Sequence, residues 1–149
     1  MTEQVVLSLL NGYENQGHVV YTDNFYTSPN LCVMLQNKNI GSCGTVKSNR
    51  KYMPQQLNPN NLKLKKNDDP VFMRTDDLVA CTWQDTKRVM LLSTVHNNLT
   101  MAKEVRSKNS ETGKCIIEKP VMANDYNKFM ADVDLLDQQL GTYCYPHKS

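Results

Sequence analysis

The sequence lacks a long hydrophobic run and carries little net charge. No apolar stretch approaches the roughly 20 residues needed to span a bilayer, and no charged-then-apolar leader stands at its start. These absences argue against a membrane or a secreted protein. The 17 basic and 15 acidic residues give a net charge of +2. Total charge therefore says little about nucleic acid, because clustering of basic residues is the signal for binding.

Cysteine is also sparse, and its spacing excludes familiar frameworks. The five cysteines form no CxxC pair and no even set that would indicate disulfides. Reduced thiols in an intracellular protein are the simplest interpretation. Cys144 and His147 form the one close Cys/His pair, which is half a zinc site at best. The other two histidines, His18 and His96, stand at the ends of apolar runs and are interpreted as structural.

The first informative acid is Asp23. The run 19–21, Val-Val-Tyr, is β-branched and aromatic and predicts a buried strand. Ser28 and Pro29 follow as the cap and first turn of a predicted helix. Asp23 is therefore expected at the carboxyl end of a strand. In an α/β sheet, ligands and catalytic groups collect at that edge, because side chains there face the crevice.

A second group of acids falls on a predicted helix over residues 122–140. At 100° per residue, Asp134 and Asp137 lie next to each other on one flank of an apolar stripe, where they can look toward a sheet. Asp125 and Asp132 fall on the opposite face and are expected in solvent. Solvent exposure is the common state of any helical aspartate. The stripe, with Tyr126 beside it, consists of Met122, Phe129, Val133, Leu136 and Leu140.

Three segments together resemble the piggyBac-type transposases and their domesticated relatives, a branch of the DDE recombinases. They are residues 23–28 (Asp-Asn-Phe-Tyr-Thr-Ser), 44–51 (Gly-Thr-Val-Lys-Ser-Asn-Arg-Lys) and the Tyr-Asn to Asp-Gln block at 126–138. Their order and spacing agree as well, so the resemblance covers nearly all 149 residues. It implies an α/β fold, namely a partial RNase H-like fold of two core strands plus helices, interrupted by a mostly β insertion domain.

The resemblance implies a two-metal site. Two Mg²⁺ (or Mn²⁺) ions roughly 3.5–4 Å apart activate the nucleophile and stabilise the leaving oxygen, and Mg²⁺ prefers carboxylate ligands. Asp23 is the candidate bridging ligand, and Asp134, aided by Asp137, is the candidate for the second ion. The family's first catalytic Asp lies upstream of the segment that resembles Asp23's, and no residue here takes that role. Because carboxylates clustered without metal repel one another, we expect weak metal binding by this chain alone.

One further residue departs from the family's pattern. Asp132 stands where the family normally has Gly. The helical turn just before Asp134 therefore carries a charge that the pattern does not expect. The helical wheel places Asp132 toward water, where the charge would be neutral in effect.

The resemblance also divides the chain. Residues 1–51 correspond to the middle part of the RNase H-like core, 52–119 to the β-rich insertion domain, and 120–149 to the core helix that carries the last Asp. Within the insertion, strands around 71–73, 78–82 and 89–96 predict a small antiparallel meander. Residues 97–117, rich in Asn, Lys and Ser, are expected to form a long loop. Trp83 is expected to pack in a core, with stacking on an unpaired base as the alternative.

Basic residues gather in three places. A run of surface lysines usually only solvates a face. The cluster of Lys47, Arg50 and Lys51 follows a predicted strand and lies near the crevice of the resembled fold, so it is the candidate DNA-binding group. Each phosphate contact there would add a salt-dependent term to binding. The other two clusters are Lys63, Lys65 and Lys66, and Lys103, Arg106 and Lys108.

Three functions remain open. The resemblance favours a fragment of a nuclear DNA transposase, whose intact parent cuts DNA and transfers strands at TTAA sites as a homodimer. The alternative is a domesticated derivative that binds DNA or chromatin without cleavage. An unrelated α/β domain with coincidental acids is the third. Because folding does not require carboxylates at residues 23, 134 and 137, their presence favours a recently active ancestor.

Overall fold

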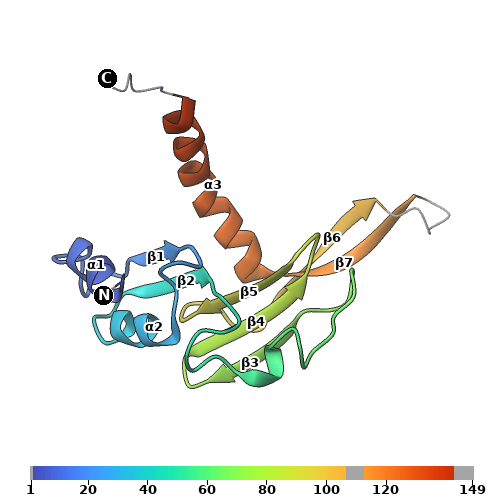
Figure 1. Cartoon of the computed structure of the whole chain (residues 1–149), viewed down its shortest axis with the longest axis horizontal. Coiled ribbons are helices and arrows are strands. Elements are labelled where there is room, and N and C mark those ends of the chain that lie inside the picture. Colours follow the sequence, from blue (N-terminus) through green and yellow to red (C-terminus); the bar gives the residue numbers. More distant parts are fainter. Residues whose placement is uncertain (1, 107–112, 143–149) are drawn as a thin grey trace, which may run out of the picture.

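The computed structural model describes residues 2–106 and 113–142, with the side chains of all of these except 134, 137 and 140–142. The structure is α/β: helices and strands alternate up to about residue 45, and a run of consecutive strands precedes the last helix (Figure 1). Among the described helices, none has the length and apolarity to cross a membrane. The elements in chain order are α1 Thr2–Leu9, β1 Val19–Thr22, α2 Pro29–Gln36, β2 Gly41–Thr45, the 3-10 turn η1 Gln55–Leu57, β3 Val71–Thr75, β4 Leu78–Gln84, β5 Arg88–Ser93, β6 Thr100–Arg106, β7 Lys114–Pro120 and α3 Val121–Thr142.

A five-stranded mixed sheet lies at the centre, with strand order β1-β2-β5-β4-β3. The strands β1 and β2 are parallel and joined through α2, whereas the other neighbours are antiparallel. The predicted meander of β3, β4 and β5 is confirmed. Since β5 pairs with β2, the strands expected in the core and those expected in the insertion form one continuous sheet. Within the described residues, β1 pairs on one side and leaves its outer edge open.

The two faces of the sheet are covered by different layers. On one face, the base of α3 and strand β7 pack against the sheet around Trp83, which is 2% exposed and therefore packed as expected. On the other face, α2 and the segment around η1 cover Ala80, Met90 and Leu92. Helices α2 and α3 thus lie on opposite faces, as Figure 1 shows.

The expectation of a long loop over residues 97–117 is wrong. Strands β6 and β7 form an antiparallel hairpin with a register running from Thr100 opposite Pro120 to Arg106 opposite Lys114. The segment is rich in Asn and Lys, which are depleted in strands, and strand preference depends strongly on packing context. The hairpin is held by such packing, because Ile117 is 7% exposed and belongs to the core beside α3.

Helix α3 is confirmed, but its apolar stripe is covered at the base alone. Met122 is fully buried, whereas Phe129, Val133 and Leu136 are about half exposed. Every described side chain from 131 to 139 is exposed. Within the described side chains, the stripe therefore packs against the sheet near the start of the helix and is exposed from Phe129 to Leu136. The helix crosses the sheet near its edge strand β1 and continues beyond it (Figure 1).

Candidate functional site

Asp23 lies directly after β1 at its carboxyl end, as the sequence predicted. The strand itself is not buried as expected, because Val19 is exposed and the other three residues are half-buried at the edge of the sheet. The segment that follows turns at once into α2, whose predicted cap is also confirmed. The Ser28 side chain accepts a hydrogen bond from the Leu31 backbone N–H at 3.0 Å, and Pro29 occupies the first turn. Such a cap satisfies one of the free N–H groups at a helix start. The strand, Asp23 and the helix are therefore joined by a short turn of defined geometry, here called the Asp23 turn (residues 23–28).

One carboxylate oxygen of Asp23 organises its own turn. Oδ1 accepts hydrogen bonds from the backbone N–H groups of Phe25 at 3.1 Å and Tyr26 at 3.3 Å. This pattern is the one by which Asp side chains stabilise tight turns. The side chain is exposed, and Oδ2 has no hydrogen bond to any residue in the described part of the chain. The turn therefore fixes the carboxylate and leaves one oxygen for a ligand.

The buried hydroxyl of Thr27 closes the Asp23 turn from inside. Its Oγ1 lies 2.7 Å from the Asp23 carbonyl oxygen and 2.8 Å from the Thr22 hydroxyl. Thr27 is 1% exposed, so these bonds are shielded from water. The turn packs directly against Gly44 of β2, where a Cβ atom would come within 3.0 Å of both the Thr22 carbonyl and the Thr27 hydroxyl. Glycine at position 44 is therefore a requirement of this packing.

Arg50 holds the same turn from outside. Its Nη2 donates to the carbonyl of Asn24 at 3.1 Å and to the carbonyl of Phe25. A guanidinium has several donors in a fixed fork, which suits two neighbouring carbonyls. In the predicted basic cluster, Arg50 thus supports the backbone beside Asp23, while Lys47 and Lys51 are exposed.

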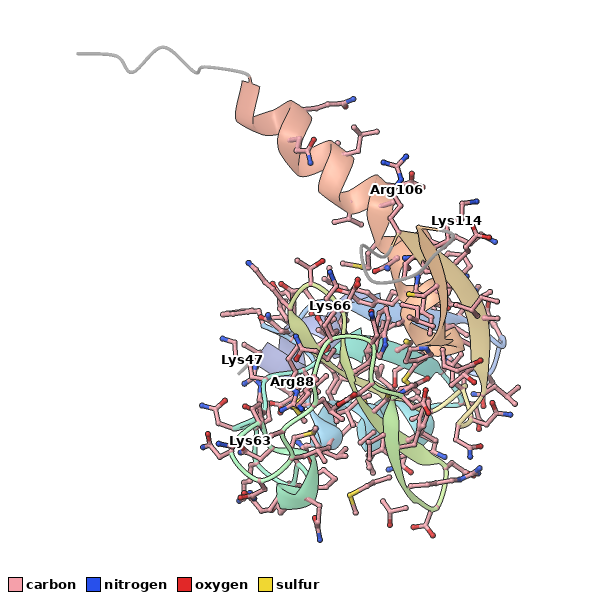
Figure 2. All side chains as sticks on the ribbon, turned by 90° about the vertical axis from the view of Figure 1, so that its right-hand side faces the viewer. Lys47, Lys63, Lys66, Arg88, Arg106 and Lys114 are labelled. Atoms are coloured by element: carbon pink, nitrogen blue, oxygen red, sulfur yellow. The ribbon has the colours of Figure 1, made fainter. Side chains whose placement is uncertain are left out.

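Lys47 also has basic neighbours that the sequence did not connect with it. The Val46 backbone N–H bonds to Met90 in β5, and Arg88 at the start of that strand donates to the Leu62 carbonyl at 2.5 Å. These contacts place Lys47, Arg88 and Lys63 in one region, and Figure 2 shows them together, away from Arg106 and Lys114 on the β6–β7 hairpin. The exposed Lys63 therefore widens the basic surface beyond the predicted cluster, whereas Nε and Nη2 of Arg88 are buried.

For the two acids predicted on the last helix, the structure describes the backbone alone. Asp134 and Asp137 belong to α3, but their side chains lie outside the described residues. The preceding turn of the helix is described, and there Met130 and Val133 line the same cavity as Asp23. This cavity has a volume of about 410 Å³, and its wall is completed by Val5, Val6, Leu9, Tyr21, Thr22 and Tyr26. Asp23 and the turn of α3 before Asp134 therefore open into one hollow.

Among the described side chains, Asp23 is the carboxylate that lines this hollow, and the other walls are mainly apolar. An aspartate oxygen such as Asp23 Oδ2 is the ligand type that Mg²⁺ prefers. Among the side chains that the structure describes, no three His, Cys, Asp or Glu residues gather as a metal site. Of the three predicted metal ligands, Asp23 is the one whose side chain the structure describes.

The thiols offer no competing ligand. Burial raises the pKa of Cys43 and of Cys81 to about 12, so both remain neutral thiols near pH 7. The thiolate is the form that binds metals. Cys32 is also buried, and Cys115 is partly buried. The predicted pair Cys144 and His147 lies outside the described residues.

The expectation that Asp125 points into solvent is wrong. Its Oδ2 lies 3.0 Å from His96 Nε2, and its side chain is 36% exposed. His96 Nδ1 in turn lies 2.8 Å from Ser93 Oγ. A helical wheel places residues relative to their own helix, whereas this contact joins α3 to a residue 29 positions earlier. The order Ser-His-Asp does not make a nucleophile here, because Ser93 is 0% exposed.

Comparisons of the sequence and of the structure with known proteins both find transposases. The family model described as Transposase IS4 matches residues 1–149. Among solved structures, the fold is similar to a chain in the cryo-EM structure of the piggyBac transposase synaptic complex with hairpin DNA, with a TM-score of 0.69 and 26% sequence identity. The match covers 94% of this chain and 27% of that one. This chain therefore spans about a quarter of the length of the protein that it resembles.

Proposed function

From the premise that this chain belongs to the transposase family described as Transposase IS4, we propose that it is part of the catalytic domain of a piggyBac-like DNA transposase. In the intact parent, that domain cuts DNA and transfers strands at TTAA sites with divalent metal ions. The sheet then corresponds to the RNase H-like core, continued by the strands of the insertion. By this proposal the parent acts in the nucleus, on transposon ends and target DNA, as a homodimer.

The observation that carries the proposal is the shared cavity. Asp23 stands at the carboxyl end of β1, and the cavity beside it is walled by Met130 and Val133 of α3. Asp134 follows Val133 directly in the helix. Carboxylates that are far apart in sequence and meet at such an edge are the usual ligands of a two-metal phosphoryl-transfer site.

Three acids of this chain would hold the metal ions. Asp23 would offer Oδ2 while Oδ1 stays bound to its own turn, and by this proposal the other two acids, Asp134 and Asp137, belong to α3. Bound divalent cations supply an activated nucleophile and charge stabilisation of the leaving oxygen. The remaining ligand of the set, the first Asp of the family, is proposed to come from a strand that pairs with the open edge of β1. That strand would place its carboxylate beside Asp23.

Basic side chains around the Asp23 turn would hold the DNA backbone. Lys47 and Lys51 are exposed next to the turn, and the exposed Lys63 extends the surface (Figure 2). Contacts of this kind position nucleic acid without reading its sequence. The similar solved chain belongs to a complex with hairpin DNA, which supports DNA as the partner.

Cleavage by an extended protein tests the proposal. The chain is produced with the upstream coding segment that supplies a strand ending in Asp, and it is incubated with Mg²⁺ or Mn²⁺ and a TTAA-containing duplex. We expect metal-dependent cleavage that is lost in Asp23→Ala and Asp134→Ala and retained in Asp132→Ala, which removes an equal charge from the same helix. Equal cleavage by all variants would remove the site assignment. DNA binding without cleavage by the unaltered protein would favour the domesticated alternative.

A further inference from the structure

The direction of α3 depends on a few contacts at its base. Met122 and Ala123 are buried against the sheet, and the ring of Phe129 stacks on Tyr21 of β1 with centroids 4.6 Å apart. Beyond Met130, the described side chains are exposed. A helix held in this way can tilt or rotate about its base if the base contacts change.

Apolar packing at the base does little to fix the orientation of the helix axis, because the hydrophobic effect is non-directional. Polar contacts supply direction. The Val121 backbone N–H donates to the Leu99 carbonyl at 3.0 Å and Lys119 Nζ donates to Asn124 Oδ1 at 3.3 Å, both next to the start of α3, and two further contacts join α3 to the sheet side. Tyr126 Oη lies 3.3 Å from Thr45 Oγ1 of β2. His96 Nε2 lies 3.0 Å from Asp125 Oδ2, in a site where the His96 side chain is 10% exposed. A partly buried hydrogen bond to a charged group is among the stronger polar contacts in proteins.

His96 is itself held firmly on the sheet side. Its Nδ1 is 2.8 Å from Ser93 Oγ, and that oxygen also accepts the backbone N–H groups of Val95 and His96 at 3.2 Å. Ser93 is fully buried and lies 3.0 Å from the Ser42 carbonyl of β2. The imidazole is therefore anchored to two neighbouring strands before it reaches the helix. Asp125 meets a fixed partner.

A small change at this contact is magnified along α3. Asp134 follows Asp125 by nine residues, and a rise of 1.5 Å per residue separates them by about 13.5 Å along the axis. A tilt of about 10° at the base would displace Asp134 by roughly 2 Å. Metal and catalytic groups work within much narrower tolerances, since a misplacement of about 1 Å can reduce a rate by roughly 100-fold.

We infer that the contact between His96 and Asp125 is a positioning device. It sets the direction in which α3 leaves the sheet, and so it sets where Asp134 stands relative to Asp23. His96 and Asp125 are positioning residues in this account, because neither lines the cavity at Asp23. The importance of Asp134 rests on the proposed function, but the direction of the helix does not.

Distances between two spin labels on the chain itself test this inference. One label is attached at Gln138→Cys on α3 and the other at Val33→Cys on α2, which is exposed on the opposite face of the sheet. Cys115→Ser and Cys144→Ser are introduced to limit labelling elsewhere. Pulsed electron paramagnetic resonance then gives the distance distribution. Asp125→Ala is expected to shift the mean by about 3 Å or to broaden the distribution, since residue 138 lies about 20 Å along the helix from residue 125.

Two variants separate positioning from loss of charge or stability. Asp132→Ala removes an exposed carboxylate from the same helix and is expected to keep the original distribution. Asp125→Asn keeps a hydrogen-bonding group opposite His96 Nε2, because an amide can either accept or donate, and it is expected to keep the original distribution as well. A folded Asp125→Ala with an unchanged distribution would overturn the inference, as would Asp125→Asn behaving like Asp125→Ala. If Asp125→Ala does not fold, His96→Ala, which removes the ring that meets Asp125, gives the same decision. No metal or DNA is needed, so the result stands apart from the cleavage assay.

Discussion

The two sides of the candidate site are held in different ways. On the β1 side, the Asp23 turn is tied by its own carboxylate, by the buried Thr27 hydroxyl and by Arg50. On the α3 side, the backbone that carries Asp134 and Asp137 extends past its last buried contacts, and the described side chains around it are exposed. One acid is therefore fixed by its immediate neighbours, whereas the others depend on how a helix is held at its base. The site can lose its geometry on the α3 side without losing the fold.

The largest expected effect lies where the sheet supports both sides. Leu91 of β5 is 0% exposed and packs in the cluster beneath the base of α3. Leu91→Ala should lower the free energy of unfolding by about 2–5 kcal/mol, because it leaves a cavity in the core. Leu136→Ala, at a residue 54% exposed on α3, should change it by less than about 0.5 kcal/mol. Urea unfolding measures both, and equal losses would contradict the comparison.

A smaller but still clear loss is expected on the β1 side from Gly44→Ala. The added methyl would press on the Thr22 carbonyl and on Thr27, and overpacking of this kind costs about 1–3 kcal/mol. Gly41→Ala is the matched control in the same strand. Its close neighbour is the side chain of Val95, which is 46% exposed and can move. Thermal unfolding should rank Gly44→Ala below Gly41→Ala, and the reverse order would argue against tight packing of the turn.

Removing one hydroxyl should have the next largest effect. Thr27→Val keeps the shape of the side chain and deletes the hydrogen bonds to Thr22 and Asp23. Because these hydrogen bonds are shielded from water and a valine cannot replace them, the free energy of unfolding should fall by about 1–2 kcal/mol. Amide hydrogen exchange at residues 25–27 should quicken relative to that of α3. Unchanged exchange there would show that Thr27 does not order the turn.

The smallest effect is expected for the ion pair between Lys38 and Glu14, which lies away from the site. It shows how little a surface contact contributes to stability. The hydrogen bond from Lys38 at 2.9 Å is the main reason that the pKa of Glu14 falls from 4.5 to about 2. A carboxyl with a lowered folded pKa stabilises the protein above pH 4.5, and this contribution is lost as the pH falls toward 2. In thermal unfolding, Lys38→Gln should therefore have a slightly lower midpoint temperature than the original protein at pH 6 and nearly the same midpoint at pH 2. A difference that grows in acid would contradict this sign.

The parts of the structure that could be predicted from sequence are those with local causes. The run 19–21 and the pair Ser28-Pro29 place Asp23 between a strand and a capped helix, and the structure confirms both. Helix α3 was likewise predicted from a local cause, namely the helical spacing of its apolar residues. The β6–β7 hairpin was missed because its composition disfavours strands and its packing on the core supplies the order.

The contact of Asp125 with His96 and the exposure of the α3 stripe were also missed. Both depend on where the helix lies relative to the sheet, and this is a matter of tertiary structure. The hydrogen bonds from Arg50 to the Asp23 turn also depend on tertiary structure. A cluster of basic residues in a sequence does not show which carbonyl groups its side chains will contact. The local pattern therefore placed the acid on the β1 side, and the long-range contacts determine the α3 side.

The most direct test of the site is to locate a divalent cation on this chain by nuclear magnetic resonance. Substoichiometric Mn²⁺ broadens the amide signals of nearby residues even when binding is weak. The account predicts broadening around Asp23 and around Asp134 together, and its loss at both places in Asp23→Asn. Broadening confined to other surface acids, such as Asp76 and Asp77, or broadening near Asp134 that survives Asp23→Asn, would contradict a site shared by β1 and α3.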